Sequence, residues 1–144
     1  MLNENQIAIP TLEPTFSGRP LLEFSVPAGF PTPARDYFEN MLDLNELMIE
    51  HPSATYFIKA DGYSMMDANI LPGDILVVDR ALDALNNKIV IAVLDGDIIV
   101  KRLKIKNNNY WLYPENDEFT PIKIESWMNF SIWGVVTWII HEAR

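Results

Sequence analysis

The chain has 144 residues, 49% of them hydrophobic, which is enough for a single domain with a buried core. Its formal net charge of −9 disfavours a duplex-DNA binder, because such proteins normally carry a basic surface. The absence of cysteine excludes disulfides, thiolate metal sites and cysteine nucleophiles. Two histidines are too few for a typical histidine-rich metal site, so we expect no metal and no cofactor.

Neither end of the sequence indicates a membrane protein. The first residues lack the basic segment and apolar run of a secretion signal. The longest apolar stretch, at 130–140, has 11 residues and is too short to span a bilayer. The expectation is a cytoplasmic protein with no membrane contact.

The first 33 residues of the chain are rich in proline and predict an extended arm. Six of the ten prolines lie within residues 1–33, and each one fixes φ and removes a backbone donor. Leu22, Phe24, Val26 and Ala28 share one parity, so an extended segment would present them on a single face. Such a face either packs as an edge strand on its own domain or docks elsewhere.

One or two short helices are predicted next. Thr32 can cap a helix that starts at Pro33 and continues through residues 34–42. Asp43 and Glu46 have the spacing of a capping box before residues 47–51, and Pro52 is expected to stop that second helix.

The remainder of the chain has the pattern of a largely antiparallel β protein. Asp95-Gly96 is a two-residue hairpin signal of the type I′ kind, and turns are also expected at residues 61–62, 72–74 and 107–109. Strands at this spacing predict a compact, curled antiparallel sheet. The expected strands cover residues 55–60, 75–79, 88–94, 97–105, 110–116, 120–124 and 131–140.

Lys101 is unusual because it shares a strand row with three branched apolar residues. The odd positions of residues 97–105 are apolar at 99, 103 and 105, and Lys101 lies among them. If that row faces the core, desolvation lowers the pKa of the ammonium, and a neutral lysine can act as a general base. The alternative is that its amine snorkels to water.

Ser64 follows an Asp-Gly turn, where backbone N–H groups can converge on one point and form an oxyanion hole. A serine here is ordinarily a turn residue, and Met65 and Met66 are ordinarily core residues. His51 abuts a proline and His141 lies near the C-terminus, so a Ser-His-Asp triad is unsupported, although triads are defined by geometry. A Ser-Lys pair is the other way to activate the hydroxyl.

Taken together, "DGYSMMDANILPGDILVVD" and "VKRL", which begins 36 residues after the serine, resemble the LexA/UmuD family of self-cleaving serine proteases. The segment "AGFPTPARDYFENMLDLNELMIEHPSATYFIKA" and the terminal "WGVVTWII" are similar to the UmuD branch in particular. The resemblance covers residues 28–144 and implies the fold of the LexA/UmuD C-terminal domain.

The resemblance also implies roles for individual residues. Ser64 corresponds to the nucleophile, Lys101 to the general base, and the backbone N–H groups of Tyr63 and Ser64 to the oxyanion hole. Ala28-Gly29 corresponds to the scissile bond. Residues 1–28 would then be an arm removed by self-cleavage, and 29–144 a protease and dimerisation domain. The cleft-docking face of the arm would comprise Leu22, Phe24, Val26 and Ala28, added in the manner of a strand.

Several positions depart from the family pattern. The UmuD branch usually has Cys-Gly at the cut, whereas this chain has Ala-Gly, and Pro27 lacks an N–H that the docked arm could use. Asp61, Tyr63 and Asn69 are atypical, and Tyr63 is placed where it could partly cover the nucleophile. These departures affect the expected rate of cleavage.

Only 28 residues precede the proposed cut, fewer than a helix-turn-helix module needs, so we expect no sequence-specific DNA binding. The resemblance implies a serine endopeptidase of SOS mutagenesis and DNA repair, stimulated by a RecA filament on single-stranded DNA. Its processed homodimer would serve an error-prone, UmuC-like Y-family polymerase in translesion synthesis. Rival hypotheses are an inactive dimeric interaction module, a signal-peptidase-like enzyme, and a single-strand binder acting through Trp111 and Tyr113.

Overall fold

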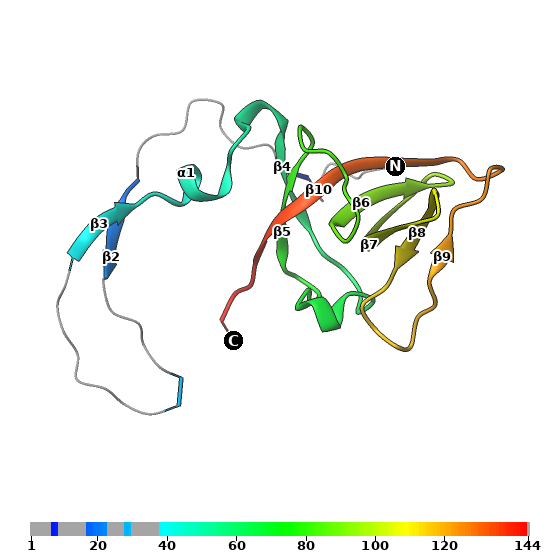
Figure 1. Cartoon of the computed structure of the whole chain (residues 1–144). Coiled ribbons are helices and arrows are strands. Elements are labelled where there is room, and N and C mark those ends of the chain that lie inside the picture. Colours follow the sequence, from blue (N-terminus) through cyan, green and yellow to red (C-terminus); the bar gives the residue numbers. More distant parts are fainter. Residues whose placement is uncertain (1–6, 9–16, 23–27, 30–37, 144) are drawn as a thin grey trace.

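A computed structural model describes residues 7–8, 17–22, 28–29 and 38–143 (Figure 1). Most strands belong to one antiparallel eight-stranded sheet with the order β1-β4-β5-β10-β6-β7-β8-β9. This confirms the prediction of a mainly β fold. The strands are β1 (Ile7–Ala8), β4 (Thr55–Lys59), β5 (Ile75–Asp79), β6 (Ile89–Leu94), β7 (Asp97–Lys106), β8 (Asn109–Tyr113), β9 (Ile122–Lys123) and β10 (Phe130–Ile140).

Two tight hairpins fix the register of the central strands. Asp95 and Gly96 both have positive φ, and Leu94 pairs with Asp97, as the type I′ signal predicted. Asn107 and Asn108 also have positive φ between β7 and β8, where Lys106 pairs with Asn109. Asparagine tolerates this conformation, so the polar run at residues 107–109 produces a second two-residue turn.

The long strand β10 curls the sheet. Its register shifts between Ile132 and Gly134 against β6, and between Val136 and Trp138 against β5. Such bulges increase the local twist of a strand. The central strands consequently bury both faces, and their successive residues alternate between two apolar cores. The first core contains Ile58, Ala60, Met65, Ile70, Leu76, Val78 and Ile91, and the second contains Val90, Ala92, Leu103, Leu112 and Val135.

The region before the sheet differs in part from the sequence prediction. The predicted helix from Pro33 lies outside the described residues up to residue 37, and Phe38–Leu42 forms strand β3, not a helix. This strand pairs antiparallel with β2 (Arg19–Leu22), so backbone pairing outweighs the local helix signal. In Figure 1 the β2–β3 pair lies to one side of the eight-stranded sheet.

The second predicted helix is present but short. Helix α1 covers Leu44–Met48, and the Asp43 carboxylate accepts from the backbone N–H of Asn45 at 2.9 Å. The helix ends before Pro52, which instead opens the 3₁₀ turn η1 (Pro52–Ala54). Within the described ranges, no helix is both long enough and apolar enough to cross a membrane.

Candidate active site

Ser64 lies in the loop that follows β4. The backbone turns at Gly62, whose φ of +80° favours glycine, and continues into the 3₁₀ turn η2 (Met66–Ala68). The Met65 side chain is buried in the first core and anchors the loop, whereas Met66 is exposed. Asn69 ends η2 in the left-handed conformation, which gives a physical reason for asparagine at that position.

A segment just after β8 fixes the backbone of this loop. The Glu115 N–H donates to the Ser64 carbonyl at 2.8 Å, and the Asp67 N–H donates to the Glu115 carbonyl at 2.8 Å. The Asn116 amide donates to the Tyr63 carbonyl at 2.8 Å, and Arg102 pairs with the Glu115 carboxylate. Sequence reasoning missed Arg102, Glu115 and Asn116, because only the sheet register brings them to the loop.

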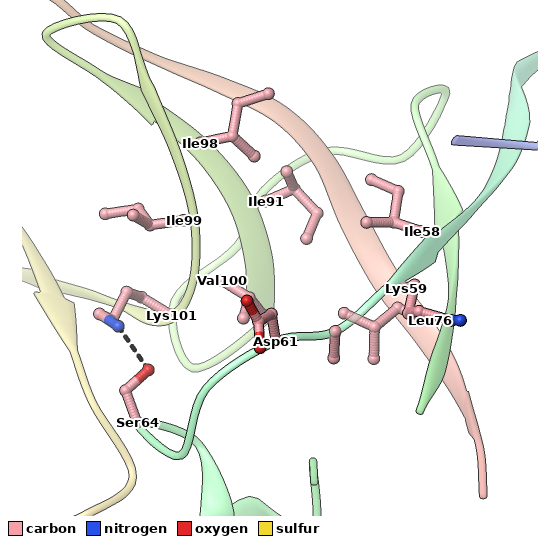
Figure 2. A pocket seen from close by; sticks show the side chains of 11 residues that line it. Ile58, Lys59, Asp61, Ser64, Leu76, Ile91, Ile98, Ile99, Val100 and Lys101 are labelled. Atoms are coloured by element: carbon pink, nitrogen blue, oxygen red, sulfur yellow. Dashed lines mark hydrogen bonds between the residues drawn. The ribbon is translucent and has the colours of Figure 1, made fainter. Parts of the chain in front are cut away.

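Lys101 reaches the same loop from β7. Its Nζ donates to Ser64 Oγ at 2.7 Å, and Figure 2 shows the two side chains pointing toward each other. Burial lowers the pKa of the Lys101 ammonium below its usual value. In the row predicted around it, Leu103 is buried and Ile99 and Ile105 pack on the second core. The amine therefore meets Ser64 and does not snorkel to open water.

The pair lines a cleft of about 190 Å³. Asp61 also lines it, and its carboxylate accepts from the Gly62 N–H at 2.9 Å. Tyr63 is 59% exposed and is not among the lining side chains, so it does not cover the cleft. The other lining residues come from β4, the residue after it, β5, β6 and β7, and are mainly apolar: Ile58, Lys59, Ala60, Leu76, Ile91, Ile98, Ile99 and Val100 (Figure 2).

Among the described residues, the backbone N–H groups of Tyr63 and Ser64 are without an acceptor. Neither donates a hydrogen bond to an acceptor in the part of the chain that the structure describes. Both N–H groups flank the nucleophile candidate at the turn. They are therefore donors that a carbonyl oxygen beside Ser64 Oγ could use.

The predicted substrate residues lie elsewhere. Ala28 and Gly29 are exposed and do not line the cleft, and a Cβ built on Gly29 would meet no heavy atom within 4 Å. Leu22 is in the predicted extended conformation, but it pairs with Phe38 of β3. Phe24 and Val26 lie outside the described residues.

Each of the two histidines pairs with an aspartate and not with Ser64. His51 Nδ1 lies 2.6 Å from the Asp79 carboxylate, and His141 Nδ1 lies 2.6 Å from that of Asp74. Neither histidine lines the cleft, so the triad alternative gains no support. Glu50 brings a third ligand atom to the His51–Asp79 pair, within 4.8 Å, and this is the metal-type cluster among the described residues. The Asp79 hydrogen bond raises the pKa of His51.

Comparison with known proteins agrees with the resemblance of the motifs. The Peptidase S24-like family matches residues 20–137. The chain is 42% identical to Protein SamA of Salmonella typhimurium, with 96% of each chain covered, and 46% identical to Protein ImpA of Escherichia coli, covering 88% of this chain and 86% of ImpA. It is 35% identical to the LexA repressor of Aeromonas hydrophila over 88% of this chain and 61% of the repressor. The chain therefore belongs to the Peptidase S24-like family, as the resemblance to LexA/UmuD proteins predicted.

Proposed function

We propose that the chain is a self-cleaving serine endopeptidase that uses Ser64 and Lys101 to cut its own Ala28–Gly29 bond. The observation that carries the proposal is the 2.7 Å contact between Lys101 Nζ and Ser64 Oγ, with the lysine pKa lowered by burial. A nucleophile within hydrogen-bond reach of a base is the arrangement that activates a serine hydroxyl.

In the first step, neutral Lys101 accepts the Ser64 proton while Oγ attacks the Ala28 carbonyl carbon. The resulting oxyanion would accept hydrogen bonds from the Tyr63 and Ser64 N–H groups. The Ala28–Gly29 C–N bond then breaks, the lysine returns the proton to the Gly29 amine, and an acyl-enzyme remains. Water, activated by the same amine, hydrolyses this ester and releases residues 1–28.

Cleavage requires a conformational change, because Ala28 is exposed and does not line the cleft. The segment that ends at Ala28 would have to enter the cleft as an added strand. A tethered substrate has a high effective concentration, so a modest shift of population suffices to start the reaction. We assign this shift to the RecA filament on single-stranded DNA: it favours the docked arm and supplies no new chemistry.

The biological role that we propose is SOS mutagenesis in the cytoplasm. Its support is family membership and the identity to SamA and ImpA over most of the chain. The processed chain, residues 29–144, would form a homodimer and assist an error-prone Y-family polymerase. Co-purification of that polymerase with the processed chain, and not with the full-length Ser64→Ala chain, is the expected result.

Mass spectrometry of the purified full-length chain tests the protease. Incubation at mildly alkaline pH, or with activated RecA, should produce a new N-terminus at Gly29. The Ser64→Ala chain should remain intact under both conditions. Absence of the Gly29 terminus in both wild-type incubations would refute the proposal, and its equal appearance in Ser64→Ala would assign the cut to a contaminating protease.

A second candidate function is an inactive interaction module with the same fold. The exposure of Ala28 and Gly29 outside the cleft favours it. This candidate predicts a dimer that binds the polymerase without any processing. The mass experiment separates the two functions, because an inactive module yields no Gly29 terminus.

A further inference from the structure

Strands β7, β8 and β9 present a basic and aromatic surface on the side away from the second core. Their even-odd alternation places Leu103, Leu112 and Ile122 in that core. The residues between them point the opposite way. We call these six residues the outer face: Arg102, Lys104, Lys106, Trp111, Tyr113 and Lys123.

The sheet register arranges the outer face in rows. Trp111 pairs with Lys104 on one side and with Lys123 on the other, so the indole lies between two lysines. Tyr113 pairs with Arg102 in the neighbouring row. Cross-strand partners have Cβ atoms about 5 Å apart, so each aromatic ring lies within reach of a cation.

The cations of the outer face contact its rings. Lys106 Nζ lies 4.8 Å from the Tyr113 ring centroid and donates to the Tyr113 hydroxyl at 2.8 Å. Lys106 and Lys123 each place Nζ 6.0 Å from the Trp111 centroid. The rings of Trp111 and Tyr113 are 6.1 Å apart and only half-buried. Neither ring belongs to the first or the second core among the described residues.

The charge of this surface is opposite to that of the whole chain. The chain has a net charge of −9, yet the paired segments 102–106, 109–113 and 122–123 contain no aspartate or glutamate. Arg102 pairs with Glu115, whereas Lys104, Lys106 and Lys123 form no ion pair with any residue that the structure describes. Three lysines around two stackable rings form a local cationic platform.

From this juxtaposition we infer that the outer face binds single-stranded nucleic acid. Lysines can follow a phosphate backbone, and aromatic rings can stack on unpaired bases of any sequence. A duplex would satisfy only the lysines, because its bases are already stacked. An acidic peptide would likewise use the charges but not the rings. The inference does not depend on the proposed protease, because no outer-face residue lines the cleft.

Fluorescence anisotropy with labelled oligonucleotides of about 16 thymidines or uridines tests the inference. The Ser64→Ala chain is used so that the protein stays whole. Saturable binding is expected at low salt, and log K should fall with log salt at a slope of about −2 for three phosphate contacts. Stronger binding of the ribose or the deoxyribose probe would identify RNA or DNA as the preferred ligand.

Variants assign the binding to the outer face. Trp111→Ala should weaken binding about 5- to 150-fold, and Lys123→Gln should weaken it and flatten the salt slope by about 0.7. The matched controls are Trp127→Ala, a tryptophan 75% exposed outside these strands, and Lys59→Gln, an exposed lysine on β4. Both controls should bind like the parent.

Thermal melting verifies that each variant is folded, and Trp111→Phe, which keeps a ring, should retain most of the affinity. Three results would overturn the inference. These are the absence of saturable binding at low salt, an equal loss in the Trp127→Ala control, and full competition by polyglutamate of similar length. The last result would show a surface for polyanions that does not use its aromatic rings.

Discussion

Around Ser64 the backbone accepts hydrogen bonds from the Glu115 N–H and the Asn116 amide, and the next side chain, Met65, is buried in a core. Ala28 and Gly29, in contrast, are exposed, and the space beside Gly29 is open. The two regions that the proposed cleavage would bring together are therefore built differently. The proposed reactive pair is preorganised and the proposed scissile bond is not, so under this proposal regulation would act on bringing the substrate into place.

Removal of the proposed base, Lys101, should have the largest effect on the cleavage rate. Lys101→Ala should slow the appearance of the Gly29 terminus by about 10²- to 10⁴-fold at neutral pH, because a general base contributes that much. In the wild-type chain the rate should rise with pH, since only the neutral amine accepts a proton. The rise should level off above the pKa of Lys101, which burial lowers. Quantitative mass spectrometry over a pH series measures both effects.

Lys101→Arg and Lys88→Ala are the controls for this prediction. Arginine keeps the positive charge but cannot lose its proton, so it should be as slow as alanine. Lys88 is exposed and does not line the cleft, so its alanine variant should cut at the wild-type rate. Normal cleavage by Lys101→Ala would contradict the Ser64–Lys101 mechanism.

Two glycine-to-alanine changes should have the next largest effects, one on the free energy of unfolding and the other on the cleavage rate. At Gly134 a new Cβ would lie 2.5 Å from Val78 Cγ1, so Gly134→Ala should lower the free energy of unfolding by about 1–3 kcal/mol. Gly29→Ala meets no atom and should leave that free energy within about 0.5 kcal/mol. It should nevertheless slow cleavage by up to about 10²-fold, because the cleft must hold the Ala28 carbonyl carbon close to Ser64 Oγ.

Urea denaturation and the Gly29-terminus assay are each applied to both variants. Stability should fall only in Gly134→Ala, and the direct loss of cleavage rate should appear in Gly29→Ala. A substantial loss of stability in Gly29→Ala would mean that residues 28–29 pack more closely than the structure shows. Unchanged stability in Gly134→Ala would mean that Val78 relaxes around the added methyl group.

Local patterns in the sequence predicted several turns, a helix cap and the strand row that carries Lys101. The turns at Asp95-Gly96 and at residues 107–109, the cap at Asp43 and the row containing Lys101 each depend on neighbours in sequence or on strand alternation. Residues 38–42 were predicted as helix and form β3, because the decisive partner is a strand about 20 residues away.

The supports of the Ser64 loop could not be predicted for a related reason. Glu115 and Asn116 are about 50 residues from Ser64 and reach it only after β7 and β8 pair in register. Neither residue belongs to a motif, and their main contacts with the loop use backbone groups or one side-chain amide. The motif shared with LexA/UmuD proteins, in contrast, identified Ser64 and Lys101, which the fold brings within 2.7 Å.

A smaller effect is expected from the support at Asn116. Its amide donates to the Tyr63 carbonyl, and its own carbonyl accepts from the Glu118 N–H at 3.0 Å. Loss of one such bond costs about 1 kcal/mol, so Asn116→Ala should slow cleavage about 5-fold. Asn116→Asp keeps the acceptor and loses only the donor, so it should be slowed similarly. The pH midpoint should stay unchanged in both variants, and a shifted midpoint would show that Asn116 acts on Lys101 instead.

The smallest effect should come from His51, which does not line the cleft. Its hydrogen bond to Asp79 raises its pKa, so the stabilisation from the protonated pair is complete below the usual histidine pKa and is lost as pH rises through the raised value. His51→Gln should remove that part of the pH dependence of stability, measured by urea denaturation at about pH 5 and about pH 9. The cleavage rate of this variant at neutral pH should match the wild type. A large change in the cleavage rate would show that the His51–Asp79 contact, beside the start of β4 and the end of β5, influences the cleft. It would contradict the expectation that this contact affects stability alone.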